Sequence, residues 1–121
     1  MTDIKNLLKE TLDTLKALKL KETDVVWVGS KDGEFVVSWE KFKKIANVEY
    51  DSDFGGPEVA IDLVVVGKDW WLERAEYDGQ EWWEFKKQPQ QQKNPKPFNR
   101  VVSEVTTTIK ELNIKKGEYY D

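Results

Sequence analysis

The sequence contains no cysteine and no histidine among its 121 residues. Without them the chain cannot build a Cys/His zinc site, a thiol nucleophile, a Ser-His-Asp triad or an imidazole base. No disulfide can form, so cysteine usage says nothing about the redox compartment. Carboxylate, lysine, tyrosine or serine chemistry remains, or no catalysis. We expect a protein that is not an enzyme and has no cofactor.

Long apolar segments are also missing. The apolar run from Leu63 to Val66 is far shorter than the roughly 18 residues that a membrane-spanning helix needs. The N-terminus carries Asp3 and Lys5 and has no continuous apolar stretch, which is not typical of a signal peptide. We therefore expect a soluble, cytoplasmic protein with no membrane partner. A chain of this length fits a single domain, residues 1–121, because domains are typically about 100–150 residues long.

Apolar residues recur at helical spacing over residues 3–20, through Ile4, Leu8 and Leu15 among others. Thr2 or Asp3 is the expected N-cap, and no Gly or Pro interrupts the segment. The spacing predicts an amphipathic helix that covers a sheet. An alternative function follows from the same segment, namely a homo-oligomeric structural protein joined through helix 3–20, for example as a homodimer.

A first β-hairpin is expected over residues 24–38, with its turn at 30–33. Ser38 resembles an N-cap, and it predicts a short helix Trp39–Ala46 with Phe42 and Ile45 on its inner face. A loop over residues 47–58 precedes a strand, 59–66. Its apolar end is typical of a central strand that is covered on both faces.

The clearest element is a second hairpin over residues 69–87, in which Asp78-Gly79 separates two aromatic-rich runs. A two-residue turn pairs Tyr77 with Gln80, and each Trp-Trp pair then sends one ring to each face of the sheet. On this register, Trp70 and Trp83 face the core, where we also expect Trp27.

Residues 88–99 form a Pro/Gln-rich segment that we expect to be a flexible loop before the C-terminal element. Residues 100–112 return to helical spacing, and we favour a helix there, although the run Thr106–Ile109 is also typical of a strand. The predicted fold class is α+β: an antiparallel sheet of about four or five strands (two hairpins) with N-terminal, middle and C-terminal helices.

The net charge of −4 conceals an uneven distribution. Residues 49–84 carry eleven acidic and two basic side chains, whereas residues 85–116 carry eight basic and two acidic ones. An acidic face suits a basic partner, or imitates a nucleic-acid backbone, although a solvated face is the simpler interpretation. Direct nucleic-acid binding by the hairpin is disfavoured, because aromatic platforms for single strands lie in basic grooves.

The second hairpin supplies the candidate partner-binding surface. Its aromatic residues suit cation–π contacts with arginine or lysine of a protein that has a basic surface, and acidic side chains surround them. The candidate residues are Trp71, Glu73, Glu76, Tyr77, Glu81, Trp82 and Glu84. The alternative is that one of the predicted helices, 3–20 or 100–112, covers this face.

A weak candidate metal site lies in the loop 51–62, where Asp51, Asp53 and Asp62 match some EF-hand ligand positions. Gly55 stands where that pattern needs a side-chain oxygen, and the flanking segments are typical of strands rather than helices. A divalent-metal-binding protein is therefore the third hypothesis, beside an Asx-type turn made by Asp51 and Asp53.

Two stretches carry a family resemblance: Phe35–Phe42 with the Gly55-Gly56 that follows, and Asp62–Phe85 with its double-Trp hairpin (DWWLER, EYDG, EWWEF). They resemble an uncharacterised family of small proteins from phages and prophages of Gram-positive bacteria. Members often have a His where this chain has Ala75. The resemblance implies a phage-encoded protein that acts in the host bacterial cytoplasm.

Together these features predict a phage accessory protein without catalytic activity. We expect it to bind a host or defence protein through the acidic, aromatic hairpin face. One form of this hypothesis is an anti-CRISPR-type or other defence inhibitor that acts by nucleic-acid mimicry.

Overall fold

The computed structural model describes residues 2–114 and divides the chain into two compact units, residues 1–88 and 89–121. All the assigned strands belong to the first unit, together with α1 and α2. The expectation of a single domain over 1–121 stays a prediction. Among residues 2–114, no helix combines the length and the apolar character that crossing a membrane requires.

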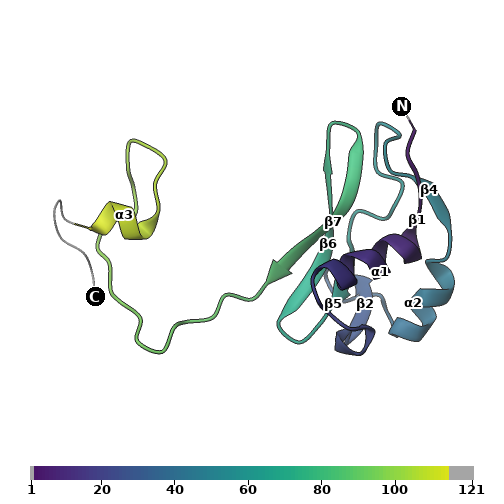
Figure 1. Cartoon of the computed structure of the whole chain (residues 1–121), viewed down its shortest axis with the longest axis horizontal. Helices are drawn as coiled ribbons and strands as arrows, with labels where there is room; N and C mark the ends of the chain where they lie inside the picture. The colour runs from purple at the N-terminus through teal and green to yellow at the C-terminus, as the bar shows by residue number, and fades with distance from the viewer. Residues whose placement is uncertain (1, 115–121) are drawn as a thin grey trace. The chain divides into compact units, whose positions relative to one another are not determined.

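The fold of the first unit is α+β, as the sequence predicts. Its main sheet is antiparallel with the strand order β3-β2-β5-β6-β7, and a second sheet pairs β1 with β4 (Figure 1). The strands are β1 (Ile4–Asn6), β2 (Trp27–Ser30), β3 (Val36–Val37), β4 (Glu49–Asp51), β5 (Leu63–Val66), β6 (Trp70–Tyr77) and β7 (Gln80–Lys87). The small β1–β4 sheet lies within segments predicted as helix and loop.

The β6–β7 hairpin has the predicted register, with Tyr77 opposite Gln80 and Leu72 opposite Phe85. Asp78 and Gly79 make the turn with positive φ angles of 52° and 86°. Two successive residues with positive φ are the requirement of a type I′ turn, whose twist matches that of the two strands. The alternation of side chains that follows from this register decides which residues reach the core.

The first helix is shorter than the predicted 3–20, since α1 spans Leu7–Ala17. The predicted caps, Thr2 and Asp3, are wrong as well. Asn6 is the N-cap, because its side chain accepts a hydrogen bond from the backbone amide of Lys9 at 3.0 Å. The residues before it are drawn into β1 by pairing with β4, which the helical periodicity does not reveal.

The Ser38 prediction is confirmed: α2 spans Trp39–Ile45, and the Ser38 hydroxyl accepts from the amide of Lys41 at 3.1 Å. Its inner face is only partly as expected. Phe42 is buried, but Ile45 is exposed, and Trp39 is buried in its place. A 3-10 turn, η1 (Glu22–Asp24), follows α1 and helps to fix this tryptophan, because its indole donates to a carboxylate oxygen of Glu22 at 2.9 Å.

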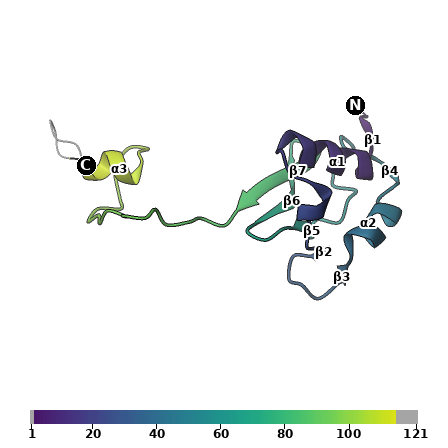
Figure 2. The same ribbon diagram turned by 60° about the horizontal axis from the view of Figure 1, so that its bottom comes forward.

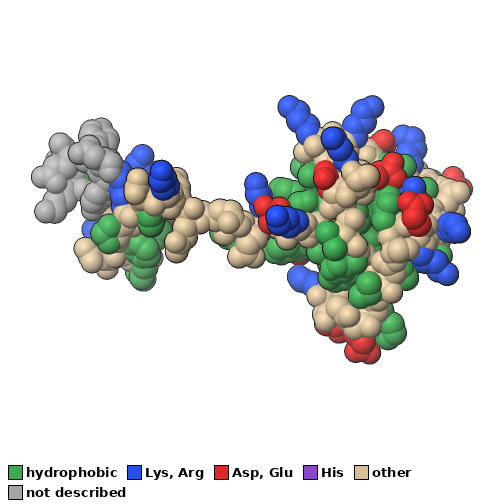
Figure 3. All heavy atoms as spheres, turned by 90° about the horizontal axis from the view of Figure 1, so that it is seen from below, with side chains coloured by type: hydrophobic (Ala, Val, Ile, Leu, Met, Phe, Trp, Pro, Cys, Tyr) green, Lys and Arg blue, Asp and Glu red, His purple; other side chains and the backbone are tan. Residues whose placement is uncertain are grey.

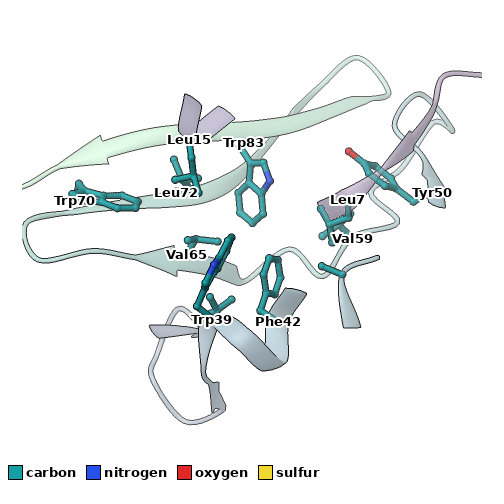
Figure 4. Close-up of a cluster of buried hydrophobic side chains, with 12 residues drawn as sticks. Leu7, Leu15, Trp39, Phe42, Tyr50, Val59, Val65, Trp70, Leu72 and Trp83 are labelled. Carbon is teal, nitrogen blue, oxygen red and sulfur yellow. The ribbon is translucent and has the colours of Figure 1, made fainter. Parts of the chain in front are cut away.

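The core lies between one face of the main sheet and the two helices (Figure 2). In Figure 4 the rings of Trp83, Trp39 and Phe42 lie close together, and Leu15 of α1 lies beside Leu72 of β6. Trp70 and Trp83 are buried there, as predicted. The predicted core position of Trp27 is wrong. Trp27 lies opposite Val66, and Val66 lies opposite Trp71, so all three side chains are on the other face of the sheet.

β5 is the central strand, although only Leu63–Val66 of the predicted 59–66 is in the sheet. The shortening has a local cause, since residues before it form a turn in which the amide of Leu63 donates to the carbonyl of Ala60. Val64 and Val65 are both almost fully buried although they face opposite sides, which confirms a strand covered on both faces.

The second unit contains α3 (Ile109–Asn113) and, up to residue 108, no other helix or strand. The predicted helix 100–112 is therefore wrong over most of its length, and the strand alternative does not form either. β-branched residues fill much of this segment and lower its helix propensity. The side chain of Asn113 instead accepts from the amides of Asn99 and Arg100 and closes a loop.

Candidate functional site

One face of the main sheet lies opposite the helices, and we call it the outer face. It is defined by the side chains that alternate away from the core: Trp27 and Gly29 of β2, Val64 and Val66 of β5, Trp71, Glu73, Ala75 and Tyr77 of β6, and Gln80, Trp82, Glu84 and Lys86 of β7. The six tryptophans of the chain are thus divided equally between this face and the core. Within residues 2–88, α1 and α2 contribute their buried side chains to the core on the other side.

Aromatic side chains of the outer face reach solvent. Tyr77 is 77% exposed and Trp82 is 37% exposed. Trp71 is half-buried, and its indole donates to a carboxylate oxygen of Glu73, two residues along the same face, at 2.7 Å. That hydrogen bond is the main cause that lowers the pKa of Glu73, with a further contribution from Lys31. The bond keeps the carboxylate ionised and fixes the Trp71 ring.

The aromatic side chains of the outer face have less negative charge around them than the sequence predicts. Glu73 lies 3.5 Å from the ammonium nitrogen of Lys31, and Glu84 lies 3.1 Å from that of Lys86. Glu76 is exposed but alternates to the core side near the hairpin turn, so it does not border the aromatic patch. The outer face is therefore aromatic with nearby charges of both signs.

Glu81 is the one predicted partner-binding residue that the structure removes from the surface. Its side chain is 3% exposed, and it faces the core, where it accepts from a terminal nitrogen of Arg74 at 2.8 Å. Its other oxygen accepts from the amide of Glu58 at 2.6 Å. The register places Glu81 on this side, since it is one residue away from the outward-facing Trp82.

Arg74 is the centre of a buried polar cluster that sequence reasoning did not identify. Its guanidinium carbon lies 4.7 Å from the ring centroid of Trp83 and 5.6 Å from that of Tyr50. Glu10 of α1 completes the cluster: one of its oxygens lies 3.5 Å from Arg74, and the other accepts from the Tyr50 hydroxyl. The cluster joins α1, β4, β6 and β7, which gives it a structural role.

The titration behaviour of the cluster follows from its burial and its charges. Burial would lower the pKa of Arg74, but the bonds to Glu81 and Tyr50 outweigh it and raise the pKa overall. Burial and the neighbouring Glu10 together raise the pKa of Tyr50 well above its usual range. Arg74 is therefore charged and Tyr50 protonated at neutral pH.

The loop 51–62 has the geometry of a turn. Asp51 is buried, and its carboxylate accepts from the amides of Asp3 and Asp53, at 2.9 and 3.0 Å. These bonds lower the pKa of Asp51. Within residues 2–114, no three carboxylates gather as a metal site would require, so Asp51, Asp53 and Asp62 are not brought together. The Asx-turn interpretation is confirmed by the bond to Asp53.

An apolar groove that the sequence did not indicate lies between α2, β3 and the segment before β5. It has a volume of about 960 Å³, and its lining includes Phe35, Val36, Ile45, Val48, Val59 and Leu63. Figure 3 shows hydrophobic side chains gathered on the first unit beside acidic and basic ones. Phe35 is 69% exposed, so an aromatic side chain reaches solvent here as well as on the outer face.

No family model, no curated protein and no solved structure matches this chain.

Proposed function

We propose that this chain is a non-catalytic accessory protein that binds a protein partner through the outer face of its β6–β7 hairpin. The supporting observation is the exposure of Trp82 and Tyr77 on a sheet face opposite both helices. Trp and Tyr are enriched at binding hot spots because they bury large areas at a low conformational cost. The phage origin and the bacterial cytoplasm belong to the same proposal and rest on the resemblance carried by residues 35–42 and 62–85.

The partner that this surface suits is a protein segment with arginine or lysine side chains. A guanidinium over Trp82 or Tyr77 would gain a cation–π contact. Glu84 lies two residues beyond Trp82 on the same face of β7 and adds an exposed carboxylate. Nucleic-acid mimicry has less support, because the carboxylates of Glu73 and Glu84 have lysine partners and Glu81 is buried.

The alternative of a homo-oligomer joined through helix 3–20 is not favoured by the packing of α1. Leu7 and Leu15 belong to the core, and Leu8, Leu12 and Leu18 pack against it. The apolar side of the helix is thus already used within the fold, and no second apolar seam remains on α1 for another copy.

Affinity capture with the full-length protein tests the proposal. The variant Tyr77→Ala/Trp82→Ala truncates the exposed aromatics of the outer face without touching a core residue. The matched control Phe35→Ala truncates an exposed aromatic residue in the turn before β3, at the opposite edge of the sheet. We expect a basic protein from a Gram-positive host to be captured by the wild type and the control but lost with the outer-face variant. Equal capture by all three proteins would contradict this choice of surface.

A further inference from the structure

The free edge of β7 is the feature that carries a further inference. In an antiparallel hairpin with a two-residue turn, the residues next to the turn form a hydrogen-bonded pair, and bonded and non-bonded pairs then alternate. At the other end of the hairpin the amide of Gln88 donates to the carbonyl of Asp69 at 2.7 Å. This bond shows that the alternation of bonded and non-bonded pairs continues unchanged along the whole hairpin. Glu81, Trp83, Phe85 and Lys87 therefore direct their backbone groups away from β6.

Most of this edge has no backbone partner. Ser52 accepts from the amide of Glu81 at 2.9 Å, and within residues 2–114 no other backbone group pairs with the outward groups of β7. The unpaired stretch spans Trp83, Phe85 and Lys87. β7 is eight residues long, and a strand edge of that length is a template for pairing with another strand.

A second copy of β7 fits this edge in one antiparallel register. If Phe85 is opposite Phe85 of the other copy, each Trp83 is opposite a Lys87, and every free N–H and C=O of the stretch finds a partner. Pairing then stops at Glu81 opposite Pro89, where one amide is already bonded and the other residue has no N–H. A register centred on Trp83 would place Glu81, whose amide is already bonded to Ser52, opposite Phe85. A register centred on Lys87 would place Pro89, which has no N–H, opposite Phe85.

The charges support the same register. It places Glu84 of each copy directly opposite Lys86 of the other, on the outer face, and opposite charges at such positions stabilise strand pairing. Trp82 is opposite the polar Gln88, so no like charges meet. Beside Trp82 and Trp83, a groove of about 550 Å³ is lined by residues of α1 and β1, so the strand borders an open groove at these two residues.

We propose that the protein forms a symmetric dimer through antiparallel pairing of β7 with β7, centred on Phe85. The two main sheets then become one continuous sheet, and the two outer faces lie side by side. Two aromatic patches would face the same way, which suits a partner with repeated sites or two-fold symmetry. The dimer does not depend on the proposed function, since it uses the strand edge and not the face.

Charge reversal at the two paired positions tests both the dimer and its register. Glu84→Lys places lysine opposite lysine at both symmetry-related pairs, and Lys86→Glu places glutamate opposite glutamate. We expect each single variant to dimerise about tenfold more weakly than the wild type, because attraction becomes repulsion at two pairs. A mixture of the two variants restores opposite charges, so a heterodimer forms at the expense of either homodimer. The control Glu34→Lys reverses an exposed charge in the turn between β2 and β3 and leaves dimerisation unchanged.

Sedimentation velocity measures the dimerisation of each protein, and native mass spectrometry distinguishes the heterodimer in the mixture. Circular dichroism shows that each variant is folded. A wild type that stays monomeric at its highest soluble concentration would overturn the proposal. So would single variants that dimerise as well as the wild type, or a mixture without preference for the heterodimer.

Discussion

Arg74 is the residue whose replacement tests the structural account most severely. Its side chain is 4% exposed, and it holds Glu81 at 2.8 Å and Glu10 at 3.5 Å between the rings of Trp83 and Tyr50. Arg74→Met keeps the unbranched stem of the side chain but removes the guanidinium and its positive charge. The buried carboxylate of Glu81 and the partly buried carboxylate of Glu10 then lose their only cation in the cluster.

The expected cost has two parts. Breaking a buried ion pair by removing one partner costs about 3–5 kcal/mol, because the remaining charge is buried without compensation. Two cation–π contacts also disappear, each contributing about 0.5–2 kcal/mol. The contributions overlap, so we expect the free energy of unfolding to fall by about 4 kcal/mol, which is a large share of the roughly 5–15 kcal/mol typical of a domain.

Urea denaturation followed by tryptophan fluorescence measures this loss, and a double-mutant cycle identifies its cause. Glu81→Gln keeps an oxygen that accepts from the Glu58 amide but has no charge. We therefore expect Arg74→Met/Glu81→Gln to be more stable than Arg74→Met alone. A loss below about 1 kcal/mol for Arg74→Met, or strictly additive effects in the cycle, would refute the buried ion pair.

Three further predictions concern single contacts. Thr11→Val should lower the free energy of unfolding, measured by urea denaturation, by about 1–3 kcal/mol. The Trp83 indole donates to the Thr11 hydroxyl at 2.9 Å and is left buried without a partner in the variant. An unchanged urea midpoint would contradict this. Gly29→Ala should lower the free energy of unfolding, measured by thermal denaturation, by about 2 kcal/mol or more, because the added methyl would lie 1.9 Å from the carbonyl oxygen of Phe35. A melting temperature equal to that of the wild type would contradict the close approach of β2 to the backbone of Phe35. The folded state lowers the pKa values of Asp51 and Glu73 below 3.8 and 4.5, their values in the unfolded chain. The stabilisation is therefore complete above those unfolded values and is lost as the pH falls below them and through the lower folded-state pKa values. Asp51→Asn should flatten this fall in denaturation midpoints measured along a pH series, and an equally steep profile would contradict the assignment.

The hairpins could be predicted from the sequence because their information is local. Asp78-Gly79 determines the turn, the turn determines the register, and the register sends Trp70 and Trp83 to one face and Trp71 and Trp82 to the other. Ser38 likewise marks the start of α2 through a contact within four residues. Such signals act before any tertiary packing is formed.

The errors arise where distant segments meet. The residues before α1 pair with β4 some 45 positions away, and their apolar spacing gives no sign of that partner. The register already turns Glu81 to the core side, but the Arg74 cluster that buries it is completed by Glu10 of α1, a distant segment that the hairpin pattern does not reveal. The segment 100–112 has helical spacing, but its β-branched residues and the Asn113 contacts favour a loop.

The central claim, that the outer face of the β6–β7 hairpin binds a protein, is tested most directly by site-specific photo-crosslinking in Gram-positive cells. A photoreactive amino acid replaces Tyr77, which is 77% exposed on the outer face, or Phe35, which is 69% exposed on the β2–β3 turn as the control. The account predicts a discrete adduct with one basic protein from position 77, lost when Trp82→Ala is added, and no such adduct from position 35. An adduct with the same protein from position 35 alone, or none from position 77 while the captured partner is present, would contradict it.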